Sequence, residues 1–253
     1  MSHSITLVGN GKMALALAKG LSKTHAIEVI GRSMAAMETF ENSLGVPVKK
    51  NLLPNADITN KTVILCVKPS NLSDVAPYLK GTALTLYSVL AGIPLESLKV
   101  ISAHNYCRAM PNLAAEAGAS MTSLVGDSAI ASNAKKLFET IGMTLWLGSE
   151  KELDIATALA GSGPAYLALI AEAFCDGAVR EGLKRDDAMT LMRGLFHGFG
   201  AIIQTIHPAL LKDGVMSPGG TTAAGYGALE KGRVREGCME AIRAAHERAK
   251  EMK

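Results

Sequence analysis

Hydrophobic residues in the first 148 positions form short β-branched runs that alternate with helix-like stretches. This pattern predicts helices at 13–21 and 33–43 and strands at 5–8, 27–30, 63–67, 83–89, 100–109, 119–125 and 144–147. The run at 63–67 is apolar throughout, which is typical of a strand covered by helices on both faces. The alternation predicts parallel βαβ units.

After Gly148 the strand pattern ends, and helices are predicted over 155–182, 186–206 and 220–250. Residues 165–174 are apolar on nearly every side, so we expect them to be buried against a second subunit. The longest apolar run approaches the length of a membrane span, but Gly161 to Pro164 interrupt it and favour a buried helix pair. We therefore predict a doubly wound α/β domain at 1–149 and an all-helical domain at 150–253.

Composition and charge narrow the classes of function. The chain of 253 residues has 26 Lys and Arg against 23 Asp and Glu, and neither half forms a basic tail, which disfavours nucleic-acid binding by charge. The four cysteines are widely spaced and are interpreted as buried apolar residues. The histidines show no metal-ligand spacing, so no metal is expected. The first residues lack the features of a secretory signal, and we expect a cytoplasmic protein without membrane contact.

The string Gly9-Asn10-Gly11-Lys12-Met13-Ala14 matches G-x-G-x-x-A between the first predicted strand and helix. The first glycine permits a tight turn, the second lets a pyrophosphate approach the backbone, and the alanine allows close helix packing. The helix N-terminus adds free N–H groups and a partial positive charge. Residues 9–13 are therefore predicted to bind the phosphates of a dinucleotide; the alternative is a turn that merely needs glycine.

The end of the second predicted strand favours a phosphorylated ribose. An NAD-binding fold usually has Asp or Glu here, whereas this chain has Gly31-Arg32-Ser33. Arg32 can hold a 2′-phosphate with a bidentate fork, and Ser33 can donate to it. NADP(H) is predicted as the cofactor, with NAD(H) as a weaker substitute. Alternatively, Ser33 only caps a helix and Arg32 is a solvated charge.

Three further strand ends carry cofactor candidates. Val67-Lys68-Pro69 closes the central strand at the edge where ligands bind in open α/β sheets. Ala91-Gly92, after the next strand, is a place where backbone and ligand can approach closely. Asn112 follows a later strand and can accept from and donate to a nicotinamide carboxamide.

Two strings in the helical half predict a substrate site. Ser217-Pro218-Gly219-Gly220-Thr221-Thr222 combines hydroxyls with the N–H groups of a helix start, which suit a small carboxylate. It contains no acid or base, so we expect polarisation and orientation rather than strong proton abstraction. Gly161 to Pro164 break an apolar helix, which indicates a kink or a binding site with Ser162 as a substrate or nicotinamide contact. A capped helix start is the structural alternative for the first string.

Together these strings resemble the pyrroline-5-carboxylate reductases over nearly the whole chain. The similar segments are 9–14, 67–69, 91–92, 108–112, 161–166 and 217–222. The resemblance implies an N-terminal Rossmann-like doubly wound α/β sheet and an all-α dimerisation domain. It also implies a homodimer, often assembled into a ring of dimers, and a substrate loop formed by Ser217, Gly220, Thr221 and Thr222.

The activity implied by the resemblance is reduction of the C=N bond of L-1-pyrroline-5-carboxylate, a cyclic imino acid, to L-proline by NADPH in the last step of proline biosynthesis. Thr222 is predicted as the catalytic residue that hydrogen-bonds the ring nitrogen and can relay its proton. The alternatives are a reductase of another cyclic imine, a hydroxyacid dehydrogenase and a nucleotide sensor without turnover. A dehydrogenase would need a general acid or base that residues 161–165 lack.

Five positions, in three segments of the chain, depart from the family pattern. Asn10 and Lys12 lie within a turn that usually reads G-A-G-N-M, and Lys12 adds a charge near the pyrophosphate. Leu113-Ala114 replace a Thr-Pro that is common in the family, so the resemblance does not imply a hydroxyl contact at position 113. Thr205 stands where some relatives have glutamate, so no carboxylate contact with the substrate nitrogen is carried over.

Overall fold

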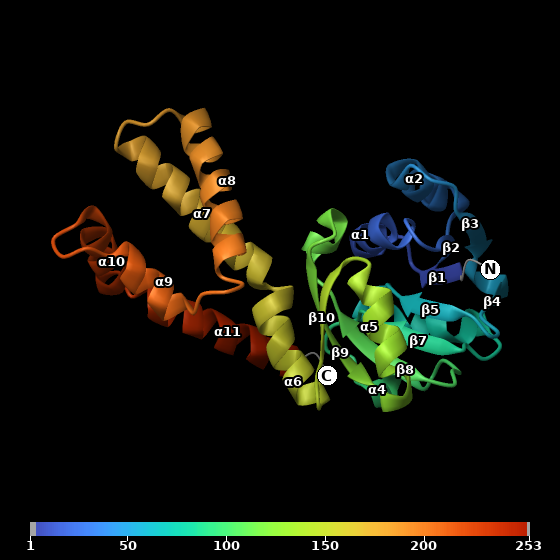
Figure 1. Ribbon diagram of the computed structural model, residues 1–253. Helices are drawn as coiled ribbons and strands as arrows, with labels where there is room; N and C mark the ends of the chain where they lie inside the picture. Colours follow the sequence, from blue (N-terminus) through green and yellow to red (C-terminus); the bar gives the residue numbers. More distant parts are fainter. Residues whose placement is uncertain (1–3, 252–253) are drawn as a thin grey trace. The chain divides into compact units, whose positions relative to one another are not determined.

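The computed structural model describes residues 4–251, which divide into two compact units. The sheet unit comprises the chain up to Pro164 and the part from Arg243 onward, and the helical unit comprises Ala165–Ile242. Figure 1 shows the strands of the sheet unit and the helices α8, α9 and α10 of the second unit, which also includes most of α7 and the first part of α11.

The sheet unit contains one eight-stranded sheet in the order β10-β9-β8-β7-β5-β1-β2-β3. Its strands are β1 (Ser4–Val8), β2 (Ala26–Gly31), β3 (Lys49–Leu52), β5 (Thr62–Leu65), β7 (Thr85–Ser88), β8 (Tyr106–Met110), β9 (Ser120–Gly126) and β10 (Gly142–Trp146). The strands from β3 to β8 in this order are parallel, whereas β9 runs antiparallel to β8 and parallel to β10. Two short strands, β4 (Ala56–Asp57) and β6 (Leu79–Lys80), pair separately.

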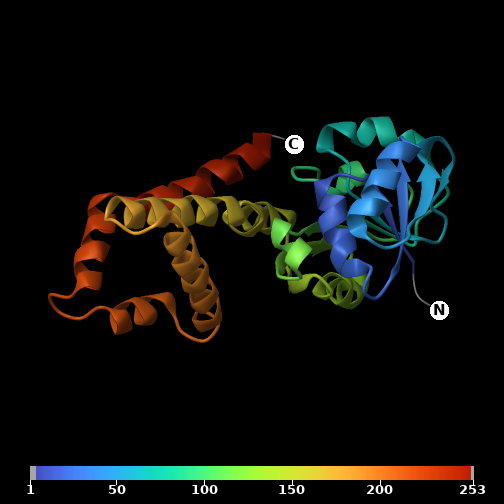
Figure 2. The ribbon, with the colours of Figure 1, turned by 90° about the horizontal axis from the view of Figure 1, so that it is seen from above.

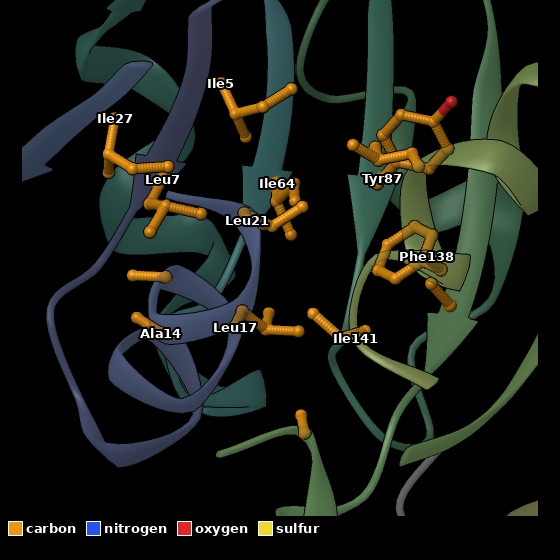
Figure 3. Close-up of a cluster of buried hydrophobic side chains, with 14 of the residues drawn as sticks. Ile5, Leu7, Ala14, Leu17, Leu21, Ile27, Ile64, Tyr87, Phe138 and Ile141 are labelled. Carbon is orange, nitrogen blue, oxygen red and sulfur yellow. The ribbon is translucent and has the colours of Figure 1, made fainter. Parts of the chain in front are cut away.

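Helices cover both faces of the sheet, as the apolar strands require. On β1, Ile5 and Leu7 belong to one buried cluster and Val8 to the other. The first cluster packs under α1 (Lys12–Leu21), α2 (Met34–Leu44) and α5 (Ala131–Glu139), and Figure 3 shows Leu17 of α1 and Phe138 of α5 among its members. The second packs under α3 (Leu72–Val75) and α4 (Leu95–Leu98). The predicted doubly wound α/β sheet is therefore confirmed.

The sheet differs from the predicted pattern in three places. The strand predicted at 100–109 begins only at Tyr106, because the first part of that range follows α4 as a loop. The sequence pattern missed β3 (Lys49–Leu52), whose residues Lys-Lys-Asn-Leu are mostly polar because it is an edge strand. The parallel order predicted throughout is wrong at β9, which turns back beside β8.

The segment after the sheet begins with α6 (Glu150–Ala156), a π-helical turn η6 (Thr157–Gly161) and α7 (Gly163–Arg180). The predicted helix over 155–182 is thus one helical path with a wide turn before Gly163. Within the described residues, one helical segment, Glu150–Arg180, is long and apolar enough to cross a membrane by length and composition alone. Only 17% of its most apolar window is buried inside this single chain.

The helical unit continues with α8 (Arg185–Ile202), α9 (Pro208–Val215), α10 (Thr221–Lys231) and the first part of α11 (Val234–Glu251), as seen in Figure 2. The sequence pattern missed α9, which starts after a loop at His207 with Pro208 in its first turn. The helix predicted over 220–250 is divided, because Arg233 adopts a left-handed backbone with φ 57° between α10 and α11.

The compact units differ from the predicted ranges 1–149 and 150–253. Residues 150–164 belong to the sheet unit because buried side chains join α6 to the sheet. Arg108 on β8 donates to Glu150 at 2.8 Å and to Asp154 at 3.0 Å, and the side chains of Arg108 and Asp154 are almost fully buried. Leu153, between these two carboxylates, packs against Met110 and Val125.

Candidate active site

A cleft of about 400 Å³ opens at the carboxyl ends of β1, β2 and β5, within the size range of small-molecule sites. The sheet order changes direction here, because β1 pairs with β2 on one side and with β5 on the other. The cleft is lined by Val8, Gly9, Asn10, Gly11, Ile30, Gly31, Arg32, Leu53, Cys66, Val67, Lys68, Ser70, Asn71 and Val75. Seven of these residues lie at or just after the ends of β1, β2 and β5, where the sequence analysis predicted cofactor contacts: Gly9, Asn10, Gly11, Gly31, Arg32, Val67 and Lys68.

The two glycines of the first turn have different physical roles. Gly9 has a left-handed φ of 108°, and a Cβ there would lie 3.0 Å from the backbone carbonyl of Cys66. Its N–H donates to the Ile30 carbonyl at 2.8 Å, which fixes the turn between the neighbouring strands. Gly11 caps α1 in an extended conformation, and a Cβ there would meet no atom within 4 Å. Gly9 therefore serves the fold, whereas Gly11 keeps space open beside the helix start.

The first N–H groups of α1 are available to bind an anion, because no side chain caps them. Gly11 offers no side-chain cap, and the first turn of α1 contains no acidic residue. The first N–H groups of the helix therefore have no side-chain partner, and they lie at the positive end of the helix dipole next to Gly11, which lines the cleft. Met13 packs partly against the core, so the group it has available for a ligand is its backbone N–H. Lys12 is exposed at the same helix start.

Arg32 and Ser33 follow the end of β2. The Arg32 side chain is exposed, lines the cleft and has no ion pair within residues 4–251. Ser33 is the N-cap of α2, and its Oγ accepts a hydrogen bond from the Ala36 N–H at 3.4 Å. The cap uses the hydroxyl as an acceptor and leaves its hydrogen available to donate. The arrangement thus gives a cation and a hydroxyl donor at one strand end.

The sequence analysis missed Ser70, Asn71, Leu53 and Val75 as residues that line the cleft. Ser70 and Asn71 form a 3-10 turn directly after Lys68, where the Asn71 N–H donates to the Lys68 carbonyl at 2.9 Å. The signal was present as Pro-Ser-Asn, a turn-forming sequence placed after a central strand. Leu53 and Val75 carried no such signal, because only the tertiary fold brings them to this edge.

Cys66 is among the residues that line the cleft and is partly buried. Burial raises the pKa of its thiol far above the ordinary value, so the sulfur stays protonated. Cys107, on β8, is also buried, and burial raises its pKa to about 12. Neither thiol is a nucleophile at neutral pH. Cys175 is buried as well, but Cys238 is exposed, so the interpretation of all four cysteines as buried residues is wrong at Cys238.

Other predicted cofactor residues lie outside the set that lines the cleft: Lys12, Met13, Ser33, Pro69, Ala91, Gly92 and Asn112. Gly92 is buried and has a left-handed φ of 76°, so its backbone requires glycine in the turn after β7. Asn112 is buried, and its carboxamide bonds to the chain itself. Its Oδ1 accepts from the Ala114 N–H at 3.1 Å, and its Nδ2 donates to the Ala160 carbonyl at 3.0 Å.

The predicted substrate loop lies in the helical unit, before α10. The Gly220 N–H donates to the Ser217 carbonyl at 3.0 Å, and Gly219 adopts a left-handed φ of 70° that closes the turn. Gly220 is the N-cap of α10 and supplies no side-chain cap. Thr221 and Thr222 are exposed in the first turn of α10, beside N–H groups that lack helical partners.

Thr222 also lines an apolar groove within the helical unit. The groove has a volume of about 520 Å³ and includes Phe199, Ile202, Leu211 and Tyr226. Lys212 lies over the Tyr226 ring at 5.6 Å and forms an ion pair with Asp213 at 2.7 Å. The Thr222 hydroxyl is thus a polar group at the border of an apolar surface.

Within residues 4–251, there is no group of three or more His, Cys, Asp or Glu side chains that could hold a metal ion. The N–H groups at the starts of α1 and α10, the Thr222 hydroxyl and the Arg32 guanidinium suit the binding of phosphates and carboxylates.

Comparison with known proteins gives two matching family models. Residues 150–252 match the pyrroline-5-carboxylate reductase dimerisation family, and residues 4–92 match the family described as NADP oxidoreductase, coenzyme F420-dependent. Pyrroline-5-carboxylate reductase from Pisum sativum is 38% identical over 268 residues, which cover 99% of this chain and 96% of that protein. The enzyme of Synechocystis sp. is 36% identical, covering 100% of this chain and 99% of the relative.

Solved structures agree with these matches. The 1-pyrroline-5-carboxylate reductase of Streptococcus pyogenes has a TM-score of 0.87 and 29% identity, covering 99% of each chain. The pyrroline carboxylate reductase of Plasmodium falciparum with NADP bound has a TM-score of 0.81 and 26% identity, covering 98% of this chain and 99% of that chain. The resemblance inferred from the sequence strings is confirmed, and the chain belongs to the pyrroline-5-carboxylate reductase family.

Proposed function

We propose that the protein is an NADPH-dependent pyrroline-5-carboxylate reductase, which reduces the C=N bond of L-1-pyrroline-5-carboxylate to L-proline in the last step of proline biosynthesis. The observation that carries this proposal is similarity to such reductases over the full length of the chain. A Rossmann-like sheet alone serves many reactions, so the fold by itself does not select one. The match of residues 150–252 to the dimerisation family of these enzymes supports the assignment.

The residues of the cleft fit a dinucleotide that carries a 2′-phosphate. The open side of Gly11 and the uncapped start of α1 leave room and N–H donors for a pyrophosphate, which Gly9 to Met13 would hold, with Lys12 adding charge. Arg32 and the Ser33 hydroxyl would hold the 2′-phosphate. Residues 67–69 and 91–92 are proposed to line the rest of the cofactor. When bound, NADPH supplies the hydride, and NADH is expected as a weaker substitute.

We assign substrate binding to Ser217, Gly219, Gly220, Thr221 and Thr222. The free N–H groups at the start of α10 suit the substrate carboxylate, and the Thr222 hydroxyl can donate to the ring nitrogen or relay its proton. Ser162 is proposed as a further contact with the substrate or the nicotinamide. Because the loop contains no strong acid or base, its residues act by binding and orientation, which can supply several kcal/mol of barrier lowering.

We further propose a cytoplasmic homodimer that forms through residues 150–253, with residues 1–149 as the cofactor domain. The exposed leucines of α7 and α8 support this role for the helical part, because such an apolar surface favours a protein partner. A ring of dimers is the proposed higher assembly, and nucleic acid and membrane are not expected partners.

The test is a direct assay with purified protein, NADPH and L-1-pyrroline-5-carboxylate, following loss of NADPH absorbance and formation of proline. The same protein with NADPH and a 2-keto acid serves as the comparison for a dehydrogenase. We expect turnover with the imine and none with the keto acid. Turnover with the keto acid alone would refute the assignment, and cofactor binding without turnover of either compound would favour a nucleotide sensor.

A further inference from the structure

The helical path between α6 and α7 contains a wide turn at η6. The Ser162 N–H donates to the carbonyl of Thr157, five residues earlier, at 3.0 Å. Such a π turn inserts one extra residue into a helix and is frequent at functional sites because it needs outside support. Ala158 is buried under the turn, whereas the neighbouring Leu159 is exposed. The question is which contacts hold this turn in place.

Asn112 provides one of these contacts from a distant part of the chain. Its Nδ2 donates to the Ala160 carbonyl at 3.0 Å, while its Oδ1 accepts from the Ala114 N–H at 3.1 Å. The backbone N–H of Asn112 donates to the Ser120 hydroxyl at 3.1 Å, which fixes its position beside β9. The side chain is 9% exposed, so these hydrogen bonds are largely shielded from water.

Arg108 of β8, four residues before Asn112, holds the helix α6 that precedes the π turn. Its guanidinium donates to Glu150, the first residue of α6, and to Asp154, one turn further along, and Arg108 is 1% exposed. Glu150 also accepts from the Leu95 N–H at 2.9 Å. The ion pairs fix α6 on the sheet, and the Asn112 amide then fixes the π turn that follows α6.

This arrangement places the π turn at a defined edge of the sheet. β8 runs parallel to β1, β5 and β7, so its carboxyl end lies at the same edge as the cleft. Asn112 follows that end, and its contact with Ala160 brings residues 161–163 to the same edge. All of these residues belong to the sheet unit.

We infer that Asn112 is a positioning residue of the reductase, whose side-chain amide holds the π turn and thereby sets the position of Ser162. This inference rests on the proposed function. It assigns to Asn112 a role through Ala160 and Ser162, in place of direct contact with the nicotinamide carboxamide. The Oδ1 atom has a separate task, because it caps the 3-10 helix η4 (Leu113–Ala117).

Two substitutions separate the tasks of the two carboxamide atoms. Asn112→Ser keeps a hydroxyl able to cap η4 but is too short to reach the Ala160 carbonyl. Asn112→Asp keeps the acceptor and loses the donor when the introduced carboxyl is ionised, but regains a donor when it is protonated. Of the elements packed on η4, α1 carries Lys12 and Lys19, and Lys19 pairs with Glu116 of η4, whereas β9 has no titratable side chain. The π turn η6 has none either, but α6, which packs on it, carries Glu150 and Asp154, both paired with Arg108 of β8.

The experiment measures kcat, KM and cofactor affinity for the wild type and both variants, with pyrroline-5-carboxylate and NADPH. We expect kcat to fall about tenfold in both variants at neutral pH, while the Kd values of NADPH and of 2′-phospho-ADP-ribose stay within about twofold. Relative to the wild type at each pH, kcat of Asn112→Asp should recover as the pH falls through the pKa of the introduced carboxyl. That of Asn112→Ser should not recover.

Two results would overturn the inference. One is an unchanged kcat in both variants, and the other is a selective loss of NADPH affinity with 2′-phospho-ADP-ribose unaffected, which would indicate direct contact with the nicotinamide. The double variant Asn112→Ser, Ser162→Ala adds a test that does not depend on the absolute rate: its loss should be smaller than the product of the two single losses. If the wild type itself shows no turnover of the imine, the proposed function fails and not this inference.

Discussion

The sheet unit and the helical unit bury their apolar residues to very different degrees. In the sheet unit, six of the ten residues of α1 are buried. In the helical unit, Cys175 is the one buried residue of α7 and Ala188 that of α8, while α9 and α10 have none. Leu169, Leu191 and Leu210 are each more than 60% exposed. One unit contains a complete core within a single chain, whereas the other presents a surface that a partner subunit must cover.

The largest expected effect comes from a charge on that exposed surface. Leu195 is 56% exposed and lines two apolar grooves of the helical unit. We expect Leu195→Glu to prevent dimerisation and to lower reductase activity on the order of 100-fold, because the helices lose the partner that completes their core. Light scattering coupled to size-exclusion chromatography, together with the assay, measures both effects.

The matched control is Leu84→Glu in the sheet unit, where the leucine is 49% exposed. The same change at similar exposure should leave the dimer and its activity intact. If both variants stay dimeric, the exposed apolar surface of the helical unit is not what forms the dimer.

The second prediction concerns the buried ion pairs that join α6 to the sheet. Asp154→Ala leaves the guanidinium of Arg108 buried with one carboxylate fewer, so the free energy of unfolding should fall by about 3 kcal/mol. The only tryptophan, Trp146, lies on β10, and its fluorescence during urea unfolding reports on the sheet unit. The control is Glu247→Ala, which removes the exposed pair with Arg243 on α11 and should change stability by less than about 0.5 kcal/mol.

The third prediction tests the cation at the end of β2. Arg32→Ala should raise the KM for NADPH by about 10- to 100-fold, because one charge-assisted contact with the 2′-phosphate is lost. NADH lacks this phosphate and is the internal control, so its KM should stay unchanged. Equal effects on both cofactors would place Arg32 elsewhere on the dinucleotide.

The fourth prediction concerns Thr222 at the start of α10. Thr222→Ala should lower kcat/KM for the imine by about tenfold, since one transition-state hydrogen bond is removed. Thr222→Ser retains the hydroxyl and should retain most of the activity. Wild-type kinetics in the alanine variant would exclude Thr222 from the mechanism.

The smallest expected effect is a pH dependence of stability in the sheet unit. Burial by itself would raise the pKa of Glu28 on β2, but hydrogen bonds from Thr6, Lys61 and Lys49 outweigh it and hold the pKa below its ordinary value. A carboxyl whose pKa is depressed in the folded state stabilises the fold fully at pH values above its unfolded pKa. This stabilisation is lost as the pH falls through the folded pKa.

Glu28→Gln should therefore make the stability of the sheet unit less dependent on pH on the acidic side, as measured by urea unfolding from pH 3 to pH 7, about the range in which carboxyls titrate. Its stability at pH 7 should also be lower, because the lysines lose their charged partner. If the free energy of unfolding of Glu28→Gln fell as steeply with decreasing pH as that of the wild type, other carboxyls would determine the acid sensitivity.

The candidate site could be predicted from the sequence where the signal is local. The glycine turn, Arg32 and the loop at 217–222 are contiguous strings whose residue types carry their own geometry, and the turn, Arg32 and Lys68 all lie at the cleft. Leu53 and Val75 were missed, since an apolar residue gives no sign of which surface it lines. The hydrogen bond from Asn112 to the Ala160 carbonyl could not be predicted either, because the two residues are 48 positions apart in the sequence.

The sequence by itself determined the alternation of strands and helices, the glycine turn between β1 and α1, and the family, because these depend on neighbouring residues and on spacings within single elements. Tertiary structure decided that β9 runs antiparallel to β8, that α6 belongs with the sheet, and that a π turn follows it. These features depend on side chains such as Arg108 and Asp154, which are 46 positions apart and meet only when the sheet is formed. Periodicity records the environment of a residue, whereas pairing between distant polar groups depends on the whole packed fold.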